Sequence, residues 1–279
     1  MFGLESKASL GLALVAVAGF AGWGGTPGSS RHSTWLATDQ ESQEFRWSGT
    51  IQPGSTLEIK GVNGEIKAEG GSGTQAEVLA TKTGKDDDPS EVSIEVIEHS
   101  DGVTVCAVYP RSTGKKPFVC APGTDGEIGS HDNDVVVNFT VRVPRGVNLT
   151  VETVNGAVEA RSIDGDVRAR TVNGSVQVTA TGAAEGQTVN GSITVSMGRT
   201  EGPLNFQTVN GSITVELPNG VGADVSASTV NGEITTDFPL TVQGRFGMRH
   251  AEGRIGAGGA DLSLETVNGS INLKRATSS

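Results

Sequence analysis

The chain has 279 residues, of which 40 are glycine, 35% are hydrophobic and only 4% are aromatic. This composition is typical of a thin core of small aliphatic residues with many tight turns, and it excludes a thick globular interior. The formal net charge of −11, with no stripe of Lys and Arg to offset it, argues against nucleic acid and anionic lipid headgroups as partners.

The first 44 residues are predicted to lie outside the folded body. An uncharged apolar run of 16 residues, 8–23, follows Lys7. It is short for a bilayer span of about 20 residues but suits the apolar region of a signal peptide. We therefore expect residues 1–21 to be a cleaved signal peptide, which leaves no transmembrane span in the mature chain. An uncleaved anchor or a buried helix is the alternative, because Glu5 cancels the charge of Lys7. Residues 22–44 are expected to be a linker.

Residues 45–145 contain strand-like runs at irregular intervals. The runs are 45–51, 56–59, 76–81, 92–97, 103–109 and 135–143. We expect a β module that begins the stack of repeats and caps it, because an unpaired end is a template for aggregation. Cys106 and Cys120 lie in this module and are expected to form a disulfide in an oxidising compartment, since no neighbouring Cys or His completes a metal site. Two reduced, buried thiols are the alternative.

Residues 146–279 are organised by the tripeptide Val-Asn-Gly. Its seven copies in the whole chain are centred on Asn63, Asn155, Asn173, Asn190, Asn210, Asn231 and Asn268. Apolar residues stand three and five positions after each Asn, as expected of a strand with one buried face. The inward positions change parity at the Thr-Val that precedes Asn. We therefore expect a corner there, with Val facing inward and the Asn side chains bridging adjacent turns of the chain from inner corners.

The spacing of the repeats predicts an all-β fold. Successive copies from Asn155 to Asn231 are 18, 17, 20 and 21 residues apart, and a second turn at Asp164 falls halfway between the first two. We predict a parallel β-solenoid (β-helix) of about six coils in chain order, each with two strands, behind the N-terminal capping module. Such coils place like residues above like at the spacing of a sheet. A meander of hairpins is the alternative, because Asn-Gly also suits hairpin turns.

The segment between Asn231 and Asn268 departs from the repeat and concentrates aromatic and basic residues in an acidic chain. Side chains of these types carry binding hot spots. The expected binding surface consists of Arg245, Phe246, Arg249 and His250. In the alternative, Phe238, Phe246 and Met248 plug the end of the core and the arginines bind loop carbonyls.

No catalytic, cofactor-binding or metal-binding site is expected. The outward positions of the repeats are mostly Ser, Thr, Gln and Asn, without the carboxylate pair that a polysaccharide-cleaving β-helix needs. The acidic run 86–88 lacks the spacing of a calcium loop, and the four histidines are scattered. We therefore expect a non-enzymatic protein, with a polysaccharide-active enzyme as the alternative.

Four segments of the chain resemble the bacterial putative-adhesin family, an exported β-strand-repeat domain of unknown function. They are the repeated TVNGSITV, the closing GRIGAGGADLSLETVNGSINL, the segment VCAVYP and the strand VNFTVRVP. The resemblance covers residues 45–275 and implies a solenoid-like fold, a location in the cell envelope and no established catalytic residues. We expect a periplasmic or surface protein that acts as an adhesin-like or scaffold solenoid, whose partner is an envelope or surface protein or glycan. A self-assembling structural rod is the alternative.

Overall fold

The structure is a computed structural model that describes residues 42–110, 119–123, 133–201, 204–245 and 248–276. The predicted signal peptide, all but the end of the predicted linker, and Phe246 lie outside the described residues. Residues Asp39–Ser279 form one compact unit. In the part of the chain that is described, no helix has the length and apolar character needed to span a membrane.

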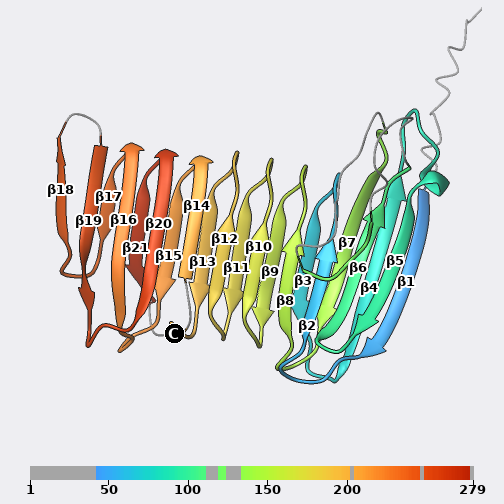
Figure 1. Ribbon diagram of the computed structural model, residues 1–279, viewed down its shortest axis with the longest axis horizontal. Helices are drawn as coiled ribbons and strands as arrows, with labels where there is room; N and C mark the ends of the chain where they lie inside the picture. Colours follow the sequence, from blue (N-terminus) through green and yellow to red (C-terminus); the bar gives the residue numbers. More distant parts are fainter. Residues whose placement is uncertain (1–41, 111–118, 124–132, 202–203, 246–247, 277–279) are drawn as a thin grey trace, which may run out of the picture. The chain divides into compact units, whose positions relative to one another are not determined.

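Strands provide nearly all the regular structure of the described residues (Figure 1). In chain order they are β1 (Ser42–Thr50), β2 (Thr56–Lys60), β3 (Ile66–Gly70), β4 (Gln75–Thr83), β5 (Ser93–His99), β6 (Gly102–Val108), β7 (Val136–Val143), β8 (Asn148–Glu152), β9 (Val158–Ile163), β10 (Val167–Arg170), β11 (Val176–Ala180), β12 (Ala184–Gln187), β13 (Ile193–Met197), β14 (Leu204–Asn210), β15 (Ile213–Leu217), β16 (Ala223–Asn231), β17 (Ile234–Thr236), β18 (Thr241–Arg245), β19 (Met248–Ile255), β20 (Ala260–Asn268) and β21 (Ile271–Arg275). One short 3-10 helix, η1 (Pro89–Glu91), precedes β5. The predicted all-β class is confirmed.

The strands form two large sheets. Sheet A has ten strands in the order β1-β4-β7-β3-β9-β11-β13-β15-β21-β17, and sheet B has eleven in the order β18-β19-β16-β20-β14-β12-β10-β8-β2-β6-β5. Consecutive repeat strands alternate between the sheets, and each pairs in parallel with its counterpart in the repeat that lies beside it in space, as β8 does with β10 and β9 with β11. Antiparallel pairs occur towards both ends of the sheets. They are β1–β4, β4–β7 and β5–β6 at one end, and β16–β19 and β18–β19 at the other. Both sheets are therefore mixed.

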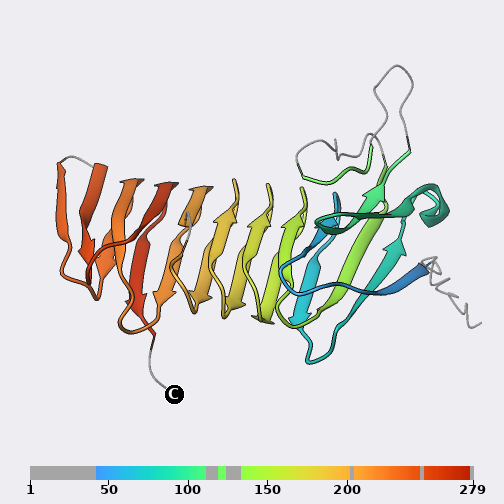
Figure 2. The same cartoon turned by 60° about the horizontal axis from the view of Figure 1, so that its bottom comes forward.

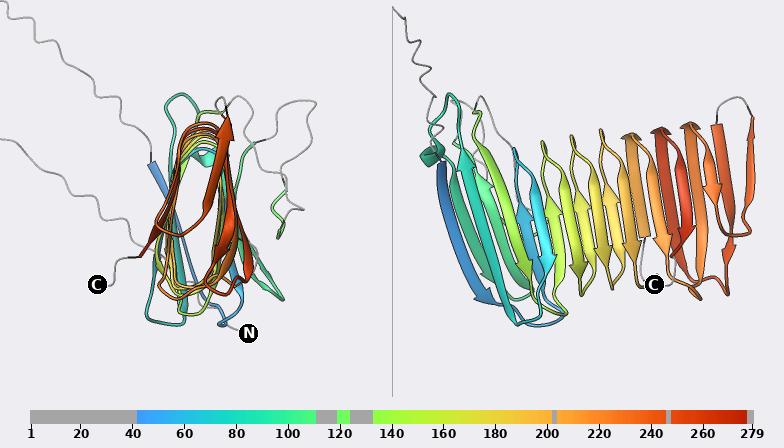
Figure 3. Two further views of the ribbon diagram at one scale, coloured as in Figure 1. Left: turned by 90° about the vertical axis from the view of Figure 1, so that its left-hand side faces the viewer. Right: turned by 180° about the vertical axis from the view of Figure 1, so that it is seen from behind.

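The core lies between the two facing sheets, as the end-on view in Figure 3 shows. Inward and outward side chains alternate along each strand: in β11, Val176 and Val178 are each 1% exposed, whereas the intervening Gln177 faces solvent. Val, Ile, Leu and Ala fill most of the core, and the rings of Phe139 and Phe206 are fully buried in it. This thin aliphatic core is the one that the composition predicts.

The repeats are not stacked in chain order. The Asn corners follow one another in space as Asn63, Asn155, Asn173, Asn190, Asn210, Asn268 and Asn231. β20 and β21 thus lie between β14–β15 and β16–β17 (Figures 1 and 2). The predicted order is wrong at this point because the insertion forms the hairpin β18–β19. β19 pairs with one edge of β16, and the chain then returns to the opposite edge as β20.

The first Val-Asn-Gly copy belongs to the same stack as the later ones. β2 pairs in parallel with β8, β3 pairs in parallel with β9, and Asn63 bridges to Asn155. β3 is not among the strand-like runs predicted from the sequence, although it follows an Asn-Gly as the other repeat strands do. Beyond β3, strands β7, β4 and β1 extend sheet A and are inclined to the central strands (Figure 1).

Candidate functional site

Buried threonines hold adjacent Val-Asn-Gly corners together. Thr208, two residues before Asn210, is 5% exposed, and its Oγ1 donates to the carbonyl oxygen of Gly191 at 2.9 Å. The equivalent bonds to the neighbouring corner come from Thr171, Thr188, Thr229 and Thr266 at 2.8–2.9 Å. A Cβ placed on Gly211 would lie 1.9 Å from the Gly191 oxygen, so the close stacking of corners requires glycine there.

The Asn side chains form a ladder of amides on the surface. Nδ2 of Asn210 donates to Oδ1 of Asn190, and Nδ2 of Asn268 donates to Oδ1 of Asn210, both at 2.8 Å. The same bond links every neighbouring pair from Asn63 to Asn231. The prediction of Asn side chains at inner corners is wrong, because the inward parity extends to Thr and the whole Val-Asn-Gly tripeptide forms the turn.

The Val of five corners is exposed, which corrects the prediction that it faces inward, whereas Val62 of the first corner is buried and Val154 of the second is half-buried. Val172, Val189, Val209, Val230 and Val267 are 38–40% exposed. They line a shallow groove of about 740 Å³ together with a polar row on sheet B. That row consists of Glu152, Arg170, Gln187, Gln207, Glu265 and Ser228. This corner groove offers an apolar line beside a row in which charged and uncharged polar groups are equally frequent.

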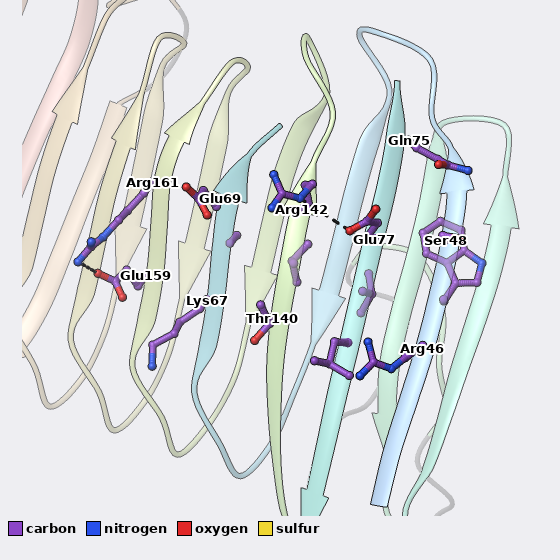
Figure 4. A pocket seen from close by; sticks show the side chains of 15 residues that line it. Arg46, Ser48, Lys67, Glu69, Gln75, Glu77, Thr140, Arg142, Glu159 and Arg161 are labelled. Carbon is purple, nitrogen blue, oxygen red and sulfur yellow. Dashed lines mark ion pairs between the residues drawn. The ribbon is translucent and has the colours of Figure 1, made fainter. Parts of the chain in front are cut away.

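A second groove, of about 770 Å³, lies on the outer face of sheet A over β1, β4, β7, β3 and β9 (Figure 4). We call it the charged groove. The pairing register of the five strands arranges its outward side chains in two rows. The first row is Ser48, Glu77, Arg142, Glu69 and Arg161, and the second is Arg46, Leu79, Thr140, Lys67 and Glu159.

Positive and negative side chains are interspersed in the charged groove. Arg142 Nε lies 3.7 Å from Glu77 Oε2, and Arg161 pairs with Glu159 on the same strand, as Figure 4 shows. The lining has four cationic and three carboxylate side chains, a balance of 4 − 3 = +1 within a chain of net charge −11. The arginine side chains of both pairs are more than half exposed. Exposed ion pairs of this kind contribute little to stability, so a ligand carboxylate can replace the glutamate in such a pair at small cost.

A buried polar cluster lies on the outer face of sheet B, beneath residues 120–123. Lys60 is 1% exposed, and its Nζ lies 3.4 Å from Glu58 Oε1 and donates to the carbonyl oxygens of Ala121 and Gly123 at 2.6 and 2.5 Å. The predicted disulfide between Cys106 and Cys120 is confirmed, and it fixes the same segment. The cluster therefore fastens a covering segment and presents no open site.

The acidic run 86–88 is organised by a further carboxylate. Backbone amides of Asp86 and Asp87 donate to the Asp134 carboxylate at 2.9 and 3.1 Å, and these bonds hold the pKa of Asp134 below its usual range. Across the described ranges, no group of three or more His, Cys, Asp or Glu side chains could hold a metal ion.

Two of the four residues of the predicted binding surface can be placed with their side chains. Arg249 and His250 lie in β19, where Arg249 Nη2 is 3.8 Å from Glu233 Oε1 and His250 Nε2 is 2.8 Å from Glu252 Oε1. Arg245 ends β18, and its side chain is outside what the structure describes. This surface stays a prediction.

The alternative interpretation of the insertion as a plug holds for one residue. Phe238 is 6% exposed and packs at the end of the core, with the Arg275 guanidinium 4.6 Å from its ring centroid. Arg249 faces a carboxylate rather than the loop carbonyls that the alternative names, and so does Arg254, whose Nε lies 2.9 Å from Asp224 Oδ1.

The charged groove is not predicted from the sequence, because its residues come from five strands that are far apart in the chain. A signal is nevertheless present: charged residues alternate with apolar ones in β3, as in Lys67 and Glu69, and in β9, as in Glu159 and Arg161. Which strands lie side by side depends on the pairing order of sheet A, where β7 separates β3 from β4.

The family model described as Toastrack DUF4097 matches residues 29–274 of the chain. Among solved structures, a putative cell adhesion protein from Clostridium sporogenes is similar at 13% identity, with 84% of this chain and 100% of that chain covered and a TM-score of 0.42. A putative adhesin from Bacteroides fragilis is similar at 10% identity, with 84% and 97% covered and a TM-score of 0.29. No curated protein matches the sequence.

Proposed function

Because the chain belongs to the Toastrack DUF4097 family, we propose that it is a non-enzymatic, adhesin-like protein that binds a carboxylate-bearing envelope or surface polymer in the charged groove. One observation carries the proposal: the strand register of sheet A fixes two rows of five outward side chains each on a broad, open face. Arg46 and Lys67 are each paired with a glutamate beside the groove, so the attraction for an anionic ligand comes from the exposed guanidinium groups of the groove rather than from its net charge. Arg142 and Arg161 suit that ligand, because guanidinium groups bind carboxylates through two hydrogen bonds.

The proposal includes export to the periplasm or cell surface. The Cys106–Cys120 disulfide supports an oxidising compartment, and the apolar run 8–23 supports a signal peptide. Intact mass of the natively expressed protein tests this part. A mature chain that begins between residues 19 and 26 supports cleavage, whereas a retained Met1 contradicts it.

We also propose that the fold is divided into a solenoid and a capping module. The parallel strands from β8 onward, with β20 and β21 set between earlier ones, form the solenoid within residues 146–279. The strands within residues 45–145 form the capping module, and the charged groove extends from that module to β9.

A binding assay with matched variants tests the function. The probes are polygalacturonate beads, neutral starch beads and the envelope fraction of the expressing cells. We expect the wild-type chain to bind polygalacturonate and the envelope fraction but not starch, and the double variant Arg142→Ala with Arg161→Ala to lose this binding. The control is Arg168→Ala on the outer face of sheet B, which breaks a pair to Glu185 at 2.8 and 3.0 Å. Equal binding by the double variant and the control would contradict the proposal.

The same samples test the polysaccharide-cleaving alternative. In the charged groove, Glu77 and Glu159 are each held by an arginine, an arrangement that favours recognition over proton transfer. We expect no new reducing ends when the wild-type chain is incubated with polygalacturonate. Their release by the wild type and not by Glu69→Gln would establish the enzyme instead.

A further inference from the structure

The position of β20 and β21 in the stack points to an exchange between two copies of the chain. These two strands form a single rung, here called the inserted rung, which lies between strands that precede it in sequence. β20 pairs with β14 on one side and with β16 on the other. β21 pairs in the same way with β15 and β17. The space for this rung, here called the slot, lies between β14–β15 and β16–β17. It is occupied by a segment that comes after β16–β19 in the sequence.

The Val-Asn-Gly motif of the inserted rung makes the same hydrogen bonds to the corners on both sides of the slot. Thr266 Oγ1 donates to Gly211 O at 2.9 Å on one side, and on the other Thr229 Oγ1 donates to Gly269 O at 2.8 Å. Backbone bonds follow the same pattern, with Gly211 N donating to Asn268 O at 3.0 Å. An identical segment from another copy satisfies each of these groups equally well, because none of the bonds depends on which chain supplies the rung.

The loop that joins β19 to the inserted rung is short and glycine-rich. Residues 256–259 read Gly-Ala-Gly-Gly, and Gly256 and Gly258 have φ values of 59° and 81°, in the left-handed region that glycine favours. The loop has to cross β16 from one edge to the other. It does so in close contact, since a Cβ on Gly222 would lie 2.1 Å from the Gly258 oxygen. A tight connection of this kind favours exchange of the segment that it carries.

We propose that two copies of this chain exchange their inserted rungs, so that residues 260–275 of each copy occupy the slot of the other. Each slot keeps the pairing and the side-chain ladders described above, while the 256–259 loop is released from its crossing. The partner is thus a second copy of the same chain, and the contact surface is the slot bounded by β14–β15 and β16–β17. Exchange is concentration-dependent, because the intramolecular rung has the advantage of a high effective concentration.

Cross-linking of mixed variants that each carry one added cysteine, besides the disulfide-bonded Cys106 and Cys120, tests the exchange in the full chain. Asn205 of β14 and Ser263 of β20 are register partners on the outer face of sheet B. The variants Asn205→Cys and Ser263→Cys are unfolded together, refolded at high concentration without reductant, and treated with a short bismaleimide. We expect a covalent dimer, in up to half of the paired molecules if copies pair at random.

The matched control mixes Asn205→Cys with Ser226→Cys. Ser226 of β16 is the other register partner of Ser263, so both control positions belong to the receiving body and never meet between copies. A third sample, with Asn205→Cys and Ser263→Cys in one chain, verifies that the reagent spans the pair. If this sample links internally while the mixed variants give no more dimer than the control, the proposal is overturned.

A loop variant provides a second test. Deleting Ala257 and Gly258 makes the crossing of β16 too short, so the inserted rung can reach only the slot of another copy. Light scattering should then give twice the monomer mass at every concentration, whereas insertion of two glycines at the same place should give the monomer. A folded, monomeric deletion variant would overturn the proposal. If the deletion prevents folding, the cross-linking result decides.

Discussion

The buried threonines, rather than the Asn ladder, are predicted to dominate the stability of the Val-Asn-Gly corners. Thr208→Val keeps the shape of the side chain and removes its hydrogen bond to Gly191 O, which is 2.9 Å long. Thr208 is only 5% exposed, so water cannot readily replace the lost donor. A buried acceptor left without a partner costs about 1–3 kcal/mol. For a domain of 150–250 residues, 1 kcal/mol corresponds to about 2–4 °C, so the melting temperature should fall by about 2–12 °C.

Asn210→Ala removes two bonds of the exposed amide ladder, both 2.8 Å long. Water solvates the freed amide groups, so each bond should contribute near the low end of the usual net range for a hydrogen bond. We expect the free energy of unfolding to fall by about 1 kcal/mol for both bonds together. Urea unfolding followed by circular dichroism gives the free energy of unfolding of each variant. The control is Thr194→Val, which makes the same chemical change at an exposed outward position of β13 and should stay within about 0.5 kcal/mol of the wild type. A loss for Asn210→Ala that equals or exceeds the loss for Thr208→Val would refute this account of the corners.

Three further predictions concern packing, covalent structure and pH. Gly211→Ala should lower the free energy of unfolding in urea by about 1–3 kcal/mol, because its methyl group would collide with the carbonyl of the neighbouring corner. A variant as stable as the wild type would show that the corners can separate. Replacing Cys106 and Cys120 together with serine should lower the free energy of unfolding by about 3 kcal/mol, and thiol labelling of the unreduced wild type should find no free thiol. The lowered pKa of Asp134 contributes stability above the usual Asp pKa, and this is lost as the pH falls through the lowered value. Asp134→Asn should therefore show a smaller acid-induced loss of stability, and an unchanged pH profile would contradict this role.

The repeat predicts local structure well because it constrains parity and turn chemistry. Positions three and five after Asn are buried as expected in every copy except that of Asn231, where Ile234 and Thr236 are partly buried; Ile193 and Val195, for example, are both 0% exposed. The orientation of Val and Asn at the corner is harder to predict. A parity change can begin at any residue of the turn. In the structure, the burial of Thr and the hydrogen bond from its Oγ1 to the glycine carbonyl of the neighbouring corner show that Thr is the last inward position.

The order of the rungs and the charged groove depend on long-range pairing. Asn231 and Asn268 carry the same motif, so sequence similarity alone cannot decide which of their rungs lies next to the rung of Asn210. The hairpin β18–β19 decides it by occupying the outer edge of β16. The charged groove likewise requires β7 to lie between β3 and β4, which brings Arg142 between Glu69 and Glu77.

Hydrogen–deuterium exchange of the full chain, with and without soluble polygalacturonate, tests the proposed binding surface most directly. The account predicts slower amide exchange in β1, β4, β7, β3 and β9 when the polymer is present, and unchanged exchange in Arg142→Ala with Arg161→Ala. Protection confined to β19 around Arg249 and His250, or to the Val-Asn-Gly corners, would place the ligand elsewhere and contradict the assignment of the charged groove.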